Sequence, residues 1–239
     1  MFGRFLELAI ATQDIAASVQ FYEHLGFVQL LTSDAWPHRY GVLSDGRIHL
    51  GLHERARPSP ALCFVRPGLA QAGARLRAAG MEPELARLGE EQLHELWLRD
   101  PAGQPINLIE ARTYSPGTLS SQRESMCGYF SHFSVPQSDF ERARVFWEGA
   151  GFVALPELDA PYAHQPLTSD WLDLAFHRRR TFDAPLLVFE CGDVAQCRAR
   201  LQALNIALSP ELPRGADSER SVLIEAPEGT LLWMVGVDS

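Results

Sequence analysis

The sequence lacks the features of a membrane-spanning, secreted or nucleic-acid-binding protein. No apolar run approaches the roughly 18 residues that a membrane-spanning helix needs. The N-terminus shows no basic region, apolar block or small-residue cleavage site of a signal peptide, which favours a cytoplasmic location. Asp and Glu outnumber Lys and Arg by 30 to 21, and the net charge is −9. This charge argues against nucleic acid or a membrane as partner, because both need a basic face.

Cysteine is scarce, and its spacing is not that of a metal site. The four cysteines, Cys63, Cys127, Cys191 and Cys197, form no C-x-x-C pair, so we expect no zinc site built from them. In a cytoplasmic protein of this size we expect reduced thiols. With 46% hydrophobic and 21% charged residues, the 239-residue chain has the composition of a globular protein with one large core or two ordinary ones.

A stretch near the N-terminus recurs in the middle of the chain. Residues 5–27 read FLELAIATQDIAASVQFYEHLGF, and residues 130–152 read FSHFSVPQSDFERARVFWEGAGF. The matching residues keep an offset of 125: Phe5, Asp14, Phe21, Tyr22, Gly26 and Phe27 correspond to Phe130, Asp139, Phe146, Trp147, Gly151 and Phe152. Each copy predicts a short strand, an Asp that caps a helix, and a Gly that ends the helix.

The residues that follow extend each copy into β-α-β-β-β modules. In the first module, hydrophobic alternation predicts strands at 5–11, 27–32, 40–43 and 48–53, with a helix that begins after Asp14. The second module is predicted to have a helix at 69–79 and strands at 61–65, 82–87, 93–99 and 105–111. The second half of the chain repeats this order, so the duplication covers the whole sequence.

The sequence therefore predicts an α+β fold of four βαβββ modules, arranged as two tandem domains with curved mixed sheets around a cup. We expect the first domain at 1–112 and the second at 129–239, joined by a polar, turn-rich linker at 113–128. A cup of this kind is where a small-molecule ligand would bind. Both a monomer and a homodimer are compatible with the sequence.

This pattern resembles the vicinal-oxygen-chelate superfamily, which includes glyoxalase I, extradiol dioxygenases, and fosfomycin- and bleomycin-resistance proteins. The resemblance is carried by Ile10 through Ile15, Ser18, Phe21-Tyr22, Leu25-Gly26-Phe27 and the turn Asp100-Pro101-Ala102-Gly103. It extends over both halves and implies two tandem glyoxalase-like domains. In glyoxalase-like members, inward-facing His, Gln or Glu residues on the first and last strands of paired modules hold a divalent metal. Here that metal would be Zn²⁺, Ni²⁺, Mn²⁺ or Fe²⁺.

The resemblance places four strong metal donors at such positions, namely Glu7, His49, His132 and Asp173. These four would form one complete set if modules one and three faced each other, although pairings of one with two or one with four are commoner in the fold. Other ligand positions hold Ala61, Leu186 and Trp233, which cannot bind a metal. These replacements argue against ring-cleaving iron chemistry.

Glu7 interrupts an otherwise apolar strand, and two interpretations of it remain open. A buried carboxylate costs free energy unless it is paired or coordinated. Glu7 is therefore either a metal ligand or general base with a raised pKa, or a carboxylate at a wet cup floor that pairs with an arginine.

Two functions are compatible with this sequence. One is a glyoxalase-like lyase or isomerase, in which a divalent metal polarises an oxygen of a small oxygen-bearing substrate and Glu7 moves the proton. The other is a metal-free binding protein that sequesters a small, partly aromatic molecule, as the bleomycin-resistance relatives do. The predicted ligand-contacting residues are Trp36, Arg39, Tyr40, Asn107, Trp171 and Trp233.

Overall fold

The structure is a computed structural model that describes residues 2–32, 36–89, 93–111 and 125–237. The first half comprises β1 (Arg4–Ala11), α1 (Ile15–His24), β2 (Val28–Leu30), β3 (Tyr40–Ser44), β4 (His49–His53), β5 (Ala61–Arg66), α2 (Leu69–Ala78), β6 (Leu85–Arg87), β7 (Glu95–Arg99) and β8 (Pro105–Glu110). The second half comprises β9 (Tyr129–Gln137), α3 (Phe140–Ala150), β10 (Val153–Ala154), β11 (His164–Thr168), β12 (Leu174–Arg178), β13 (Leu186–Cys191), α4 (Val194–Ala203), β14 (Ser221–Glu225) and β15 (Leu231–Gly236).

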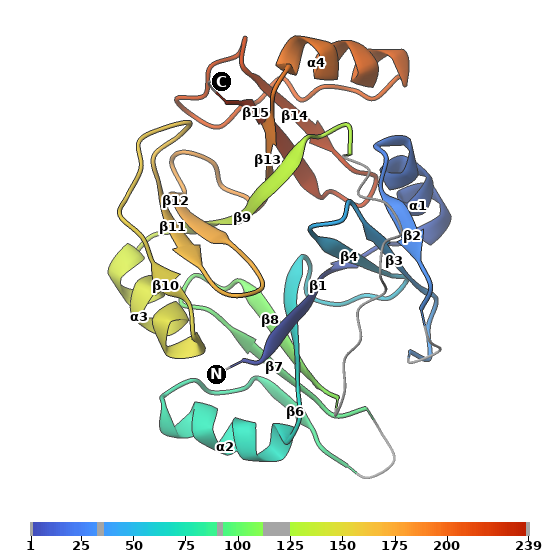
Figure 1. Cartoon of the computed structure of the whole chain (residues 1–239). Coiled ribbons are helices and arrows are strands. Elements are labelled where there is room, and N and C mark those ends of the chain that lie inside the picture. Colours follow the sequence, from blue (N-terminus) through green and yellow to red (C-terminus); the bar gives the residue numbers. More distant parts are fainter. Residues whose placement is uncertain (1, 33–35, 90–92, 112–124, 238–239) are drawn as a thin grey trace.

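Each half forms one mixed sheet, as Figure 1 shows. The first sheet has eight strands in the order β2-β3-β4-β1-β5-β8-β7-β6, and the second has seven in the order β10-β11-β12-β9-β13-β15-β14. In each sheet the first strands of two consecutive modules pair antiparallel, β1 with β5 and β9 with β13. The predicted α+β fold of tandem βαβββ modules is therefore confirmed, with module one paired to two and module three to four.

Helix caps explain why the two halves start alike. The carboxylate of Asp14 accepts a hydrogen bond from the Ala17 backbone N–H at 3.0 Å, and Asp139 accepts one from Arg142 at the same distance. Such bonds satisfy N–H groups that have no partner within the first helical turn. At the other end Gly26 has a φ of +92°, a conformation that favours glycine.

The fourth module departs from the predicted strand order. Its second strand is reduced to an isolated bridge between Leu208 and Ile224, so the second sheet has seven strands. Pro210 and Pro213 lie in the segment after Leu208. Proline has no N–H to donate to a strand ladder, which explains why a regular edge strand does not continue there.

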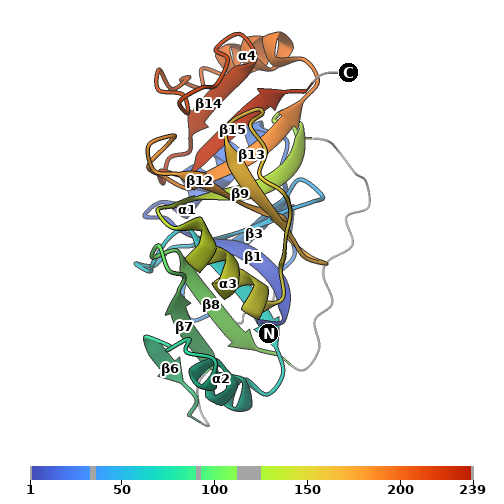
Figure 2. The ribbon, with the colours of Figure 1, turned by 90° about the vertical axis from the view of Figure 1, so that its left-hand side faces the viewer.

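The two halves pack against each other through a pair of reciprocal contacts. Glu228, in the turn before β15, accepts hydrogen bonds from Ser18 at 2.8 Å and from Tyr22 at 2.7 Å, both on α1 of the first half. Asp100, in the turn before β8, accepts one from Gln137 at 2.5 Å and one from Trp147 of α3 at 3.3 Å. The first helix of each half thus contacts the opposite half (Figure 2).

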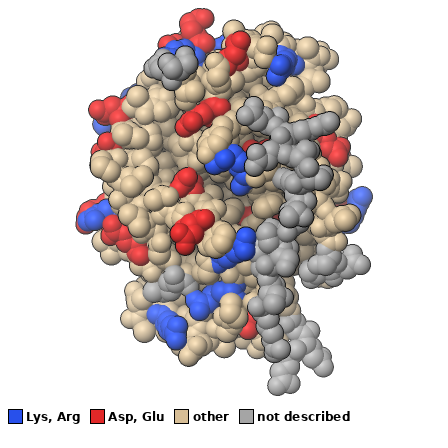
Figure 3. All heavy atoms as spheres, viewed as in Figure 1, with Lys and Arg blue, Asp and Glu red and all other residues tan. Residues whose placement is uncertain are grey.

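Acidic and basic side chains both occur on the side of the molecule that Figure 3 draws. None of the described helices is long and apolar enough to cross a membrane. The predicted linker falls outside the described residues as far as residue 124, so the domain boundaries at 112 and 129 stay a prediction.

Candidate functional site

Each sheet buries one face against its helices, and the opposite, inner face carries polar side chains. A row of paired residues crosses each inner face at equivalent strand positions. In the first sheet this row is Glu7, Cys63 and Asn107, and in the second it is His132, Val188 and Trp233. We call these inner faces the first cup and the second cup.

In the first cup, Glu7 is the centre of a buried hydrogen-bond group. Tyr40 donates a short hydrogen bond to one oxygen of Glu7, and the other oxygen lies 3.0 Å from Nε2 of His53. Nδ1 of His53 in turn lies 2.9 Å from Nε2 of His38. Glu7 and His53 are almost fully buried, with exposed fractions of 1% and 0%. Both interpretations of Glu7, as a functional group and as a carboxylate paired with an arginine, require a partner. The structure supplies Tyr40 and His53 as partners rather than an arginine.

Burial keeps these imidazoles neutral. Burial lowers the pKa of His53, and it also lowers the pKa of His38. A neutral His53 that donates from Nε2 to the Glu7 carboxylate must accept at Nδ1, so His38 donates from its own Nε2. The remaining nitrogen, Nδ1 of His38, is buried and has no hydrogen-bond partner among the residues that the structure describes.

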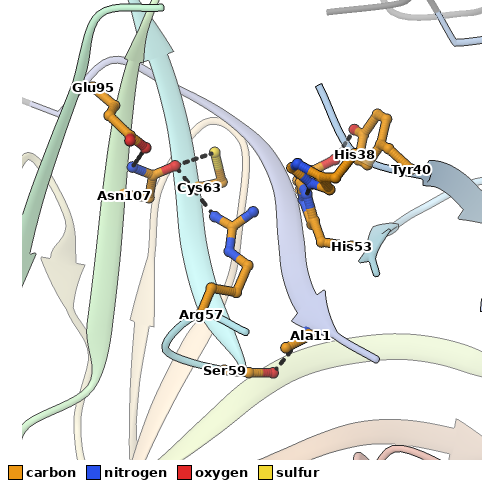
Figure 4. Close-up of polar contacts among 10 residues, drawn as sticks. Ala11, His38, Tyr40, His53, Arg57, Ser59, Cys63, Glu95 and Asn107 are labelled. Carbon is orange, nitrogen blue, oxygen red and sulfur yellow. Dashed lines mark hydrogen bonds and ion pairs between the residues drawn. The ribbon is translucent and has the colours of Figure 1, made fainter. Parts of the chain in front are cut away.

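A second polar group lies beside the first, and Figure 4 shows its side chains pointing toward one another. Arg57 donates to Oδ1 of Asn107 at 3.4 Å, and the amide of Asn107 donates to Glu95, also at 3.4 Å. Arg57 also lies 4.9 Å from the ring centroid of Trp97. Next to it is a cavity of about 340 Å³, lined by Trp36, Arg55, Ala56, Arg57, Pro58, Glu84, Leu85, Arg87, Glu95, Trp97, Leu98, Arg99 and Pro105.

The second cup holds a longer chain of hydrogen bonds. His132 Nε2 lies 2.7 Å from the Tyr162 hydroxyl, which donates to Ser134 at 2.8 Å. Ser134 lies 2.7 Å from Nδ1 of His177, whose Nε2 lies 2.9 Å from the backbone carbonyl of Phe182. Burial lowers the pKa of His132 to about 3 and that of His177 to about 4, so both rings are neutral near pH 7.

The carbonyl at the end fixes the direction of this chain. A carbonyl only accepts, so His177 carries its proton on Nε2 and accepts at Nδ1 from Ser134. Tyr162 then donates to Ser134, and its oxygen accepts from Nε2–H of His132. This leaves Nδ1 of His132 as an acceptor, 3.1 Å from the hydroxyl of Ser131.

His164 presents another acceptor to the same cup. Its Nδ1 lies 2.7 Å from the backbone carbonyl of Tyr162, so Nδ1 carries the proton and Nε2 has a free lone pair. Within the described part of the chain, Nε2 of His164 makes no hydrogen bond. Burial lowers the pKa of His164, which keeps the ring neutral. The ring stacks on Tyr162 with 4.4 Å between centroids.

Ser131, His132 and His164 line a cavity of about 650 Å³ in the second cup. Its apolar wall includes Leu155, Leu158, Leu167, Leu174, Val188 and Val235, and its polar wall includes Ser131, His132, His164 and Glu190. A mostly apolar cavity with a few placed polar groups is typical of small-molecule sites. In size it also falls within the usual range for such sites.

The sequence-predicted site residues fall into three places. Glu7, Tyr40, Asn107 and Trp36 come together in the first cup, where Trp36 lines the 340 Å³ cavity. His132, Asp173 and Trp233 belong to the second half, His132 and Asp173 at the 650 Å³ cavity and Trp233 buried beside Tyr162. Arg39 is exposed and pairs with Glu54, and Trp171 is half-exposed with Arg4 over its ring.

The predicted four-residue metal set is not assembled. Modules pair one with two and three with four, so Glu7 and His49 lie in one sheet, whereas His132 and Asp173 belong to the other half. Glu7 is occupied by Tyr40 and His53, and both ring nitrogens of His132 lie within hydrogen-bond distance of hydroxyl groups. Among the described residues, no group of three or more His, Cys, Asp or Glu side chains is placed to hold a metal ion. The donor set therefore does not fit the metal that the resemblance implies.

Sequence reasoning did not single out several residues that the structure places in the cups: Arg57, Glu95, Trp97, Tyr162 and His164. One signal was available for Trp97, because the turn at 100–103 sets the β7–β8 register that pairs it with Asn107. Arg57 lies in a loop, where no periodicity indicates which way a side chain points.

Comparison with known proteins supports the fold and little beyond it. No family model matches the sequence, and no curated protein matches it. Among solved structures, homoprotocatechuate 2,3-dioxygenase from Arthrobacter globiformis aligns with a TM-score of 0.65 and 17% identity, covering 100% of this chain and 80% of that one. The 2,3-dioxygenase LapB from Pseudomonas sp. KL28 aligns with a TM-score of 0.63 and 15% identity, covering 100% of this chain and 94% of that one.

A catechol 2,3-dioxygenase gives a TM-score of 0.59 at 15% identity, over 99% of this chain and 88% of that one. The chain thus has the fold of these dioxygenases, with two tandem units that are each built from a pair of βαβββ modules. The predicted resemblance is confirmed at the level of fold. At these identities it shows the fold alone.

Proposed function

We propose that this protein binds a small aromatic molecule with hydroxyl groups in the second cup, without a bound metal. The observation that carries this proposal is the 650 Å³ cavity, whose polar wall presents the neutral imidazoles of His132 and His164 as hydrogen-bond acceptors. A hydroxyl group of a ligand donates to such an acceptor, and an apolar wall accommodates the ring.

Two further observations support this ligand class. Ser131, Glu190 and His132 meet at one side of the cavity, where Ser131 lies 3.0 Å from Glu190 and 3.1 Å from His132. One hydroxyl hydrogen cannot satisfy both neighbours, so a donor from the ligand would complete the group. The solved structures with this fold are named as dioxygenases of catechol and homoprotocatechuate.

Metal-based ring opening is not part of the proposal. Across the strands from His132 lie Val188 and then Trp233, neither of which can coordinate a metal. Of the two functions predicted from the sequence, metal-free binding is therefore the one we propose. The lyase or isomerase chemistry has no supporting set of metal donors.

Binding can be tested with four ligands of similar shape. Phenol and catechol have hydroxyl donors, whereas anisole and 1,2-dimethoxybenzene have none. We expect phenol and catechol to raise the melting temperature and to bind in isothermal titration calorimetry, and the methylated pair to bind about tenfold more weakly or not at all. A factor of ten corresponds to about 1.4 kcal/mol, which is at the upper end of the roughly 0.5–1.5 kcal/mol typical of one hydrogen bond.

The matched variants are His164→Phe, which removes the acceptor but keeps a ring, and His24→Phe, an exposed position on α1. His164→Phe should lose about tenfold in affinity for phenol, and His24→Phe should bind as the original protein does. The proposal is wrong if anisole binds as well as phenol, if His164→Phe changes nothing, or if none of the four ligands binds. Elemental analysis of the same samples should show no stoichiometric metal that disappears in His132→Ala.

A further inference from the structure

The first cup contains a cation whose charge no neighbouring carboxylate neutralises directly. Arg57 follows β4 and reaches back over the inner face of the first sheet, where it is partly buried (Figure 4). No carboxylate among the described residues forms an ion pair with it. Its Nε is buried without a hydrogen-bond partner in the described part of the chain, and its bond to Asn107 is long at 3.4 Å. Burial lowers the pKa of this guanidinium.

The acidic groups nearby are already engaged elsewhere. Glu95 pairs with Arg87 at 2.6 Å and also accepts from the indole of Trp97 at 2.8 Å. Glu7 accepts from Tyr40 and His53. Both carboxylates favour the charged form of Arg57 through space without contacting it. A buried cation without a close counter-charge is costly, and a bound anion would remove that cost.

The cavity beside Arg57 is lined by two aromatic rings, which suit a flat anion. Trp36 and Trp97 flank Arg57, with ring centroids 5.8 Å and 4.9 Å from its guanidinium carbon. Both tryptophans also pack against a buried cluster of the first sheet that includes Ala9, Ala61 and Cys63. At about 340 Å³ the cavity is at the lower end of the range for small-molecule sites, so it suits a ligand with one ring.

The net charge of the cavity lining also favours an anion. Of its four arginines, Arg87 pairs with Glu95 and Arg99 pairs with Glu84. Arg55 and Arg57 have no carboxylate partner among the described residues and lie in one loop. In a chain of net charge −9, two such cations at one cavity form a local site of the opposite sign. A guanidinium binds a carboxylate through two parallel hydrogen bonds, and its unused Nε–H provides one of them.

We propose that the 340 Å³ cavity of the first cup binds a small aromatic carboxylate, with Arg57 holding the carboxylate and Trp36 and Trp97 contacting the ring. This site is separate from the one proposed for the second cup, and it recognises charge rather than hydroxyl donors. The two sites therefore predict different responses to the same variants.

The test uses benzoate as the probe, with benzamide as its neutral counterpart and inorganic phosphate as an anion without a ring. In isothermal titration calorimetry we expect benzoate to bind and to quench tryptophan fluorescence. Benzamide and phosphate should each bind at least tenfold more weakly. Equal binding of benzamide would overturn the role of charge, and equal binding of phosphate would overturn the role of the ring.

Two variants at Arg57 and two controls locate the site. Arg57→Gln should lose at least tenfold in benzoate affinity, and Arg57→Lys should lose less because it keeps the charge but not the planar fork. Arg39→Gln, at an exposed arginine paired with Glu54, should bind benzoate normally. His164→Phe should also leave benzoate binding unchanged, which separates the two cups. Unchanged benzoate affinity in Arg57→Gln, or loss of it in His164→Phe, would overturn the assignment.

Discussion

At the scale of single residues, the two cups differ in where their hydrogen bonds end. In the first cup the chain ends on the carboxylate of Glu7, so Tyr40 and His53 both direct their protons inward. In the second cup the chain of hydrogen bonds ends on the carbonyl of Phe182. Each donor therefore points along this chain toward Phe182, and Nδ1 of His132 is left as an acceptor. The same strand position thus holds the carboxylate of Glu7 in one half and the neutral acceptor His132 in the other.

The neutral histidines of the second cup predict a specific dependence of stability on pH. The pKa of His132 is about 3 and that of His177 about 4 in the folded protein, both below the usual value of 6.5. Below pH 6.5 the unfolded chain takes up protons that the folded chain does not. The free energy of unfolding should therefore fall as the pH is lowered from about 6.5 toward the folded pKa values, by up to about 1.4 kcal/mol per pH unit for each histidine.

His132→Gln tests this assignment, because glutamine can donate and accept hydrogen bonds but does not titrate. Urea unfolding between pH 7 and pH 4 should show a shallower loss of stability in the variant. His24→Gln, at an exposed position at the end of α1, should keep the original slope. Burial also lowers the pKa of His38, His49, His53 and His164, so a slope remains in the variant. Identical slopes in the original protein and in His132→Gln would contradict the prediction.

At the scale of elements, one glycine of β4 makes room for the buried carboxylate of β1. A Cβ atom placed on Gly51 would lie 2.2 Å from the carboxyl carbon of Glu7. At the equivalent place in the second sheet, opposite Ser134 of β9, the chain has Ala175. Glu7 can therefore lie across β4 toward His53 only because this position lacks a side chain.

Gly51→Ala should displace Glu7 from Tyr40 and His53 and destabilise the protein by about 1–3 kcal/mol, the usual cost of forcing extra atoms into a packed site. Gly41→Ala on β3 is the matched control, because the nearest atoms to its added Cβ lie 3.7 Å and 3.9 Å away. Chemical unfolding of both variants measures the difference.

The double variant Glu7→Ala with Gly51→Ala identifies the cause of the effect. If the clash with the carboxylate is responsible, Gly51→Ala should cost much less in the Glu7→Ala background, and the two changes should not be additive. Additive losses would show that the backbone of β4, and not Glu7, resists the substitution.

The same scale shows what the sequence can predict. The helices and most strands follow local signals, such as the Asp14 cap and the alternation in β1, and these elements lie where they were expected. The bond between His53 and Glu7 depends on the pairing of β1 with β4, which a strand pattern does not specify. The sequence therefore predicts Glu7 as a site residue but not its bond to His53. It does not predict the cavity beside Arg57, because the orientation of Arg57 depends on the path of a loop.

At the scale of the whole molecule, the duplication gives two copies of one architecture with different inner surfaces. The repeat at a constant offset was enough to predict two sheets and their helices, because each half repeats the same caps and strand order. It could not predict how the halves meet. That contact includes Asp100 and Glu228, each in the turn before the last strand of its half and each bonded to a helix or strand of the other half.

The contact made by Asp100 should contribute to stability beyond its own turn. One carboxylate oxygen accepts from the backbone N–H groups of Ala102 and Gln104 at 2.9 Å each, and the other accepts from Gln137 and Trp147 of the second half. Asp100→Ala would leave the buried indole N–H of Trp147 and the amide of Gln137 without this acceptor. Each unsatisfied buried donor costs about 1–3 kcal/mol, so the loss should exceed that of a turn alone.

Asp45→Ala isolates the contribution of a turn, because Asp45 also accepts two backbone N–H groups of its own turn at 2.9 Å and, among the described residues, makes no side-chain hydrogen bond across the halves. We expect Asp100→Ala to lose about 1–3 kcal/mol more than Asp45→Ala in urea unfolding. We also expect tryptophan fluorescence and far-UV circular dichroism to give separate transitions only in Asp100→Ala, because the halves then unfold less cooperatively. Equal losses in the two variants, with coincident transitions in both, would mean that Asp100 acts only within its turn and that other contacts, such as those of Glu228 with Ser18 and Tyr22, couple the two halves.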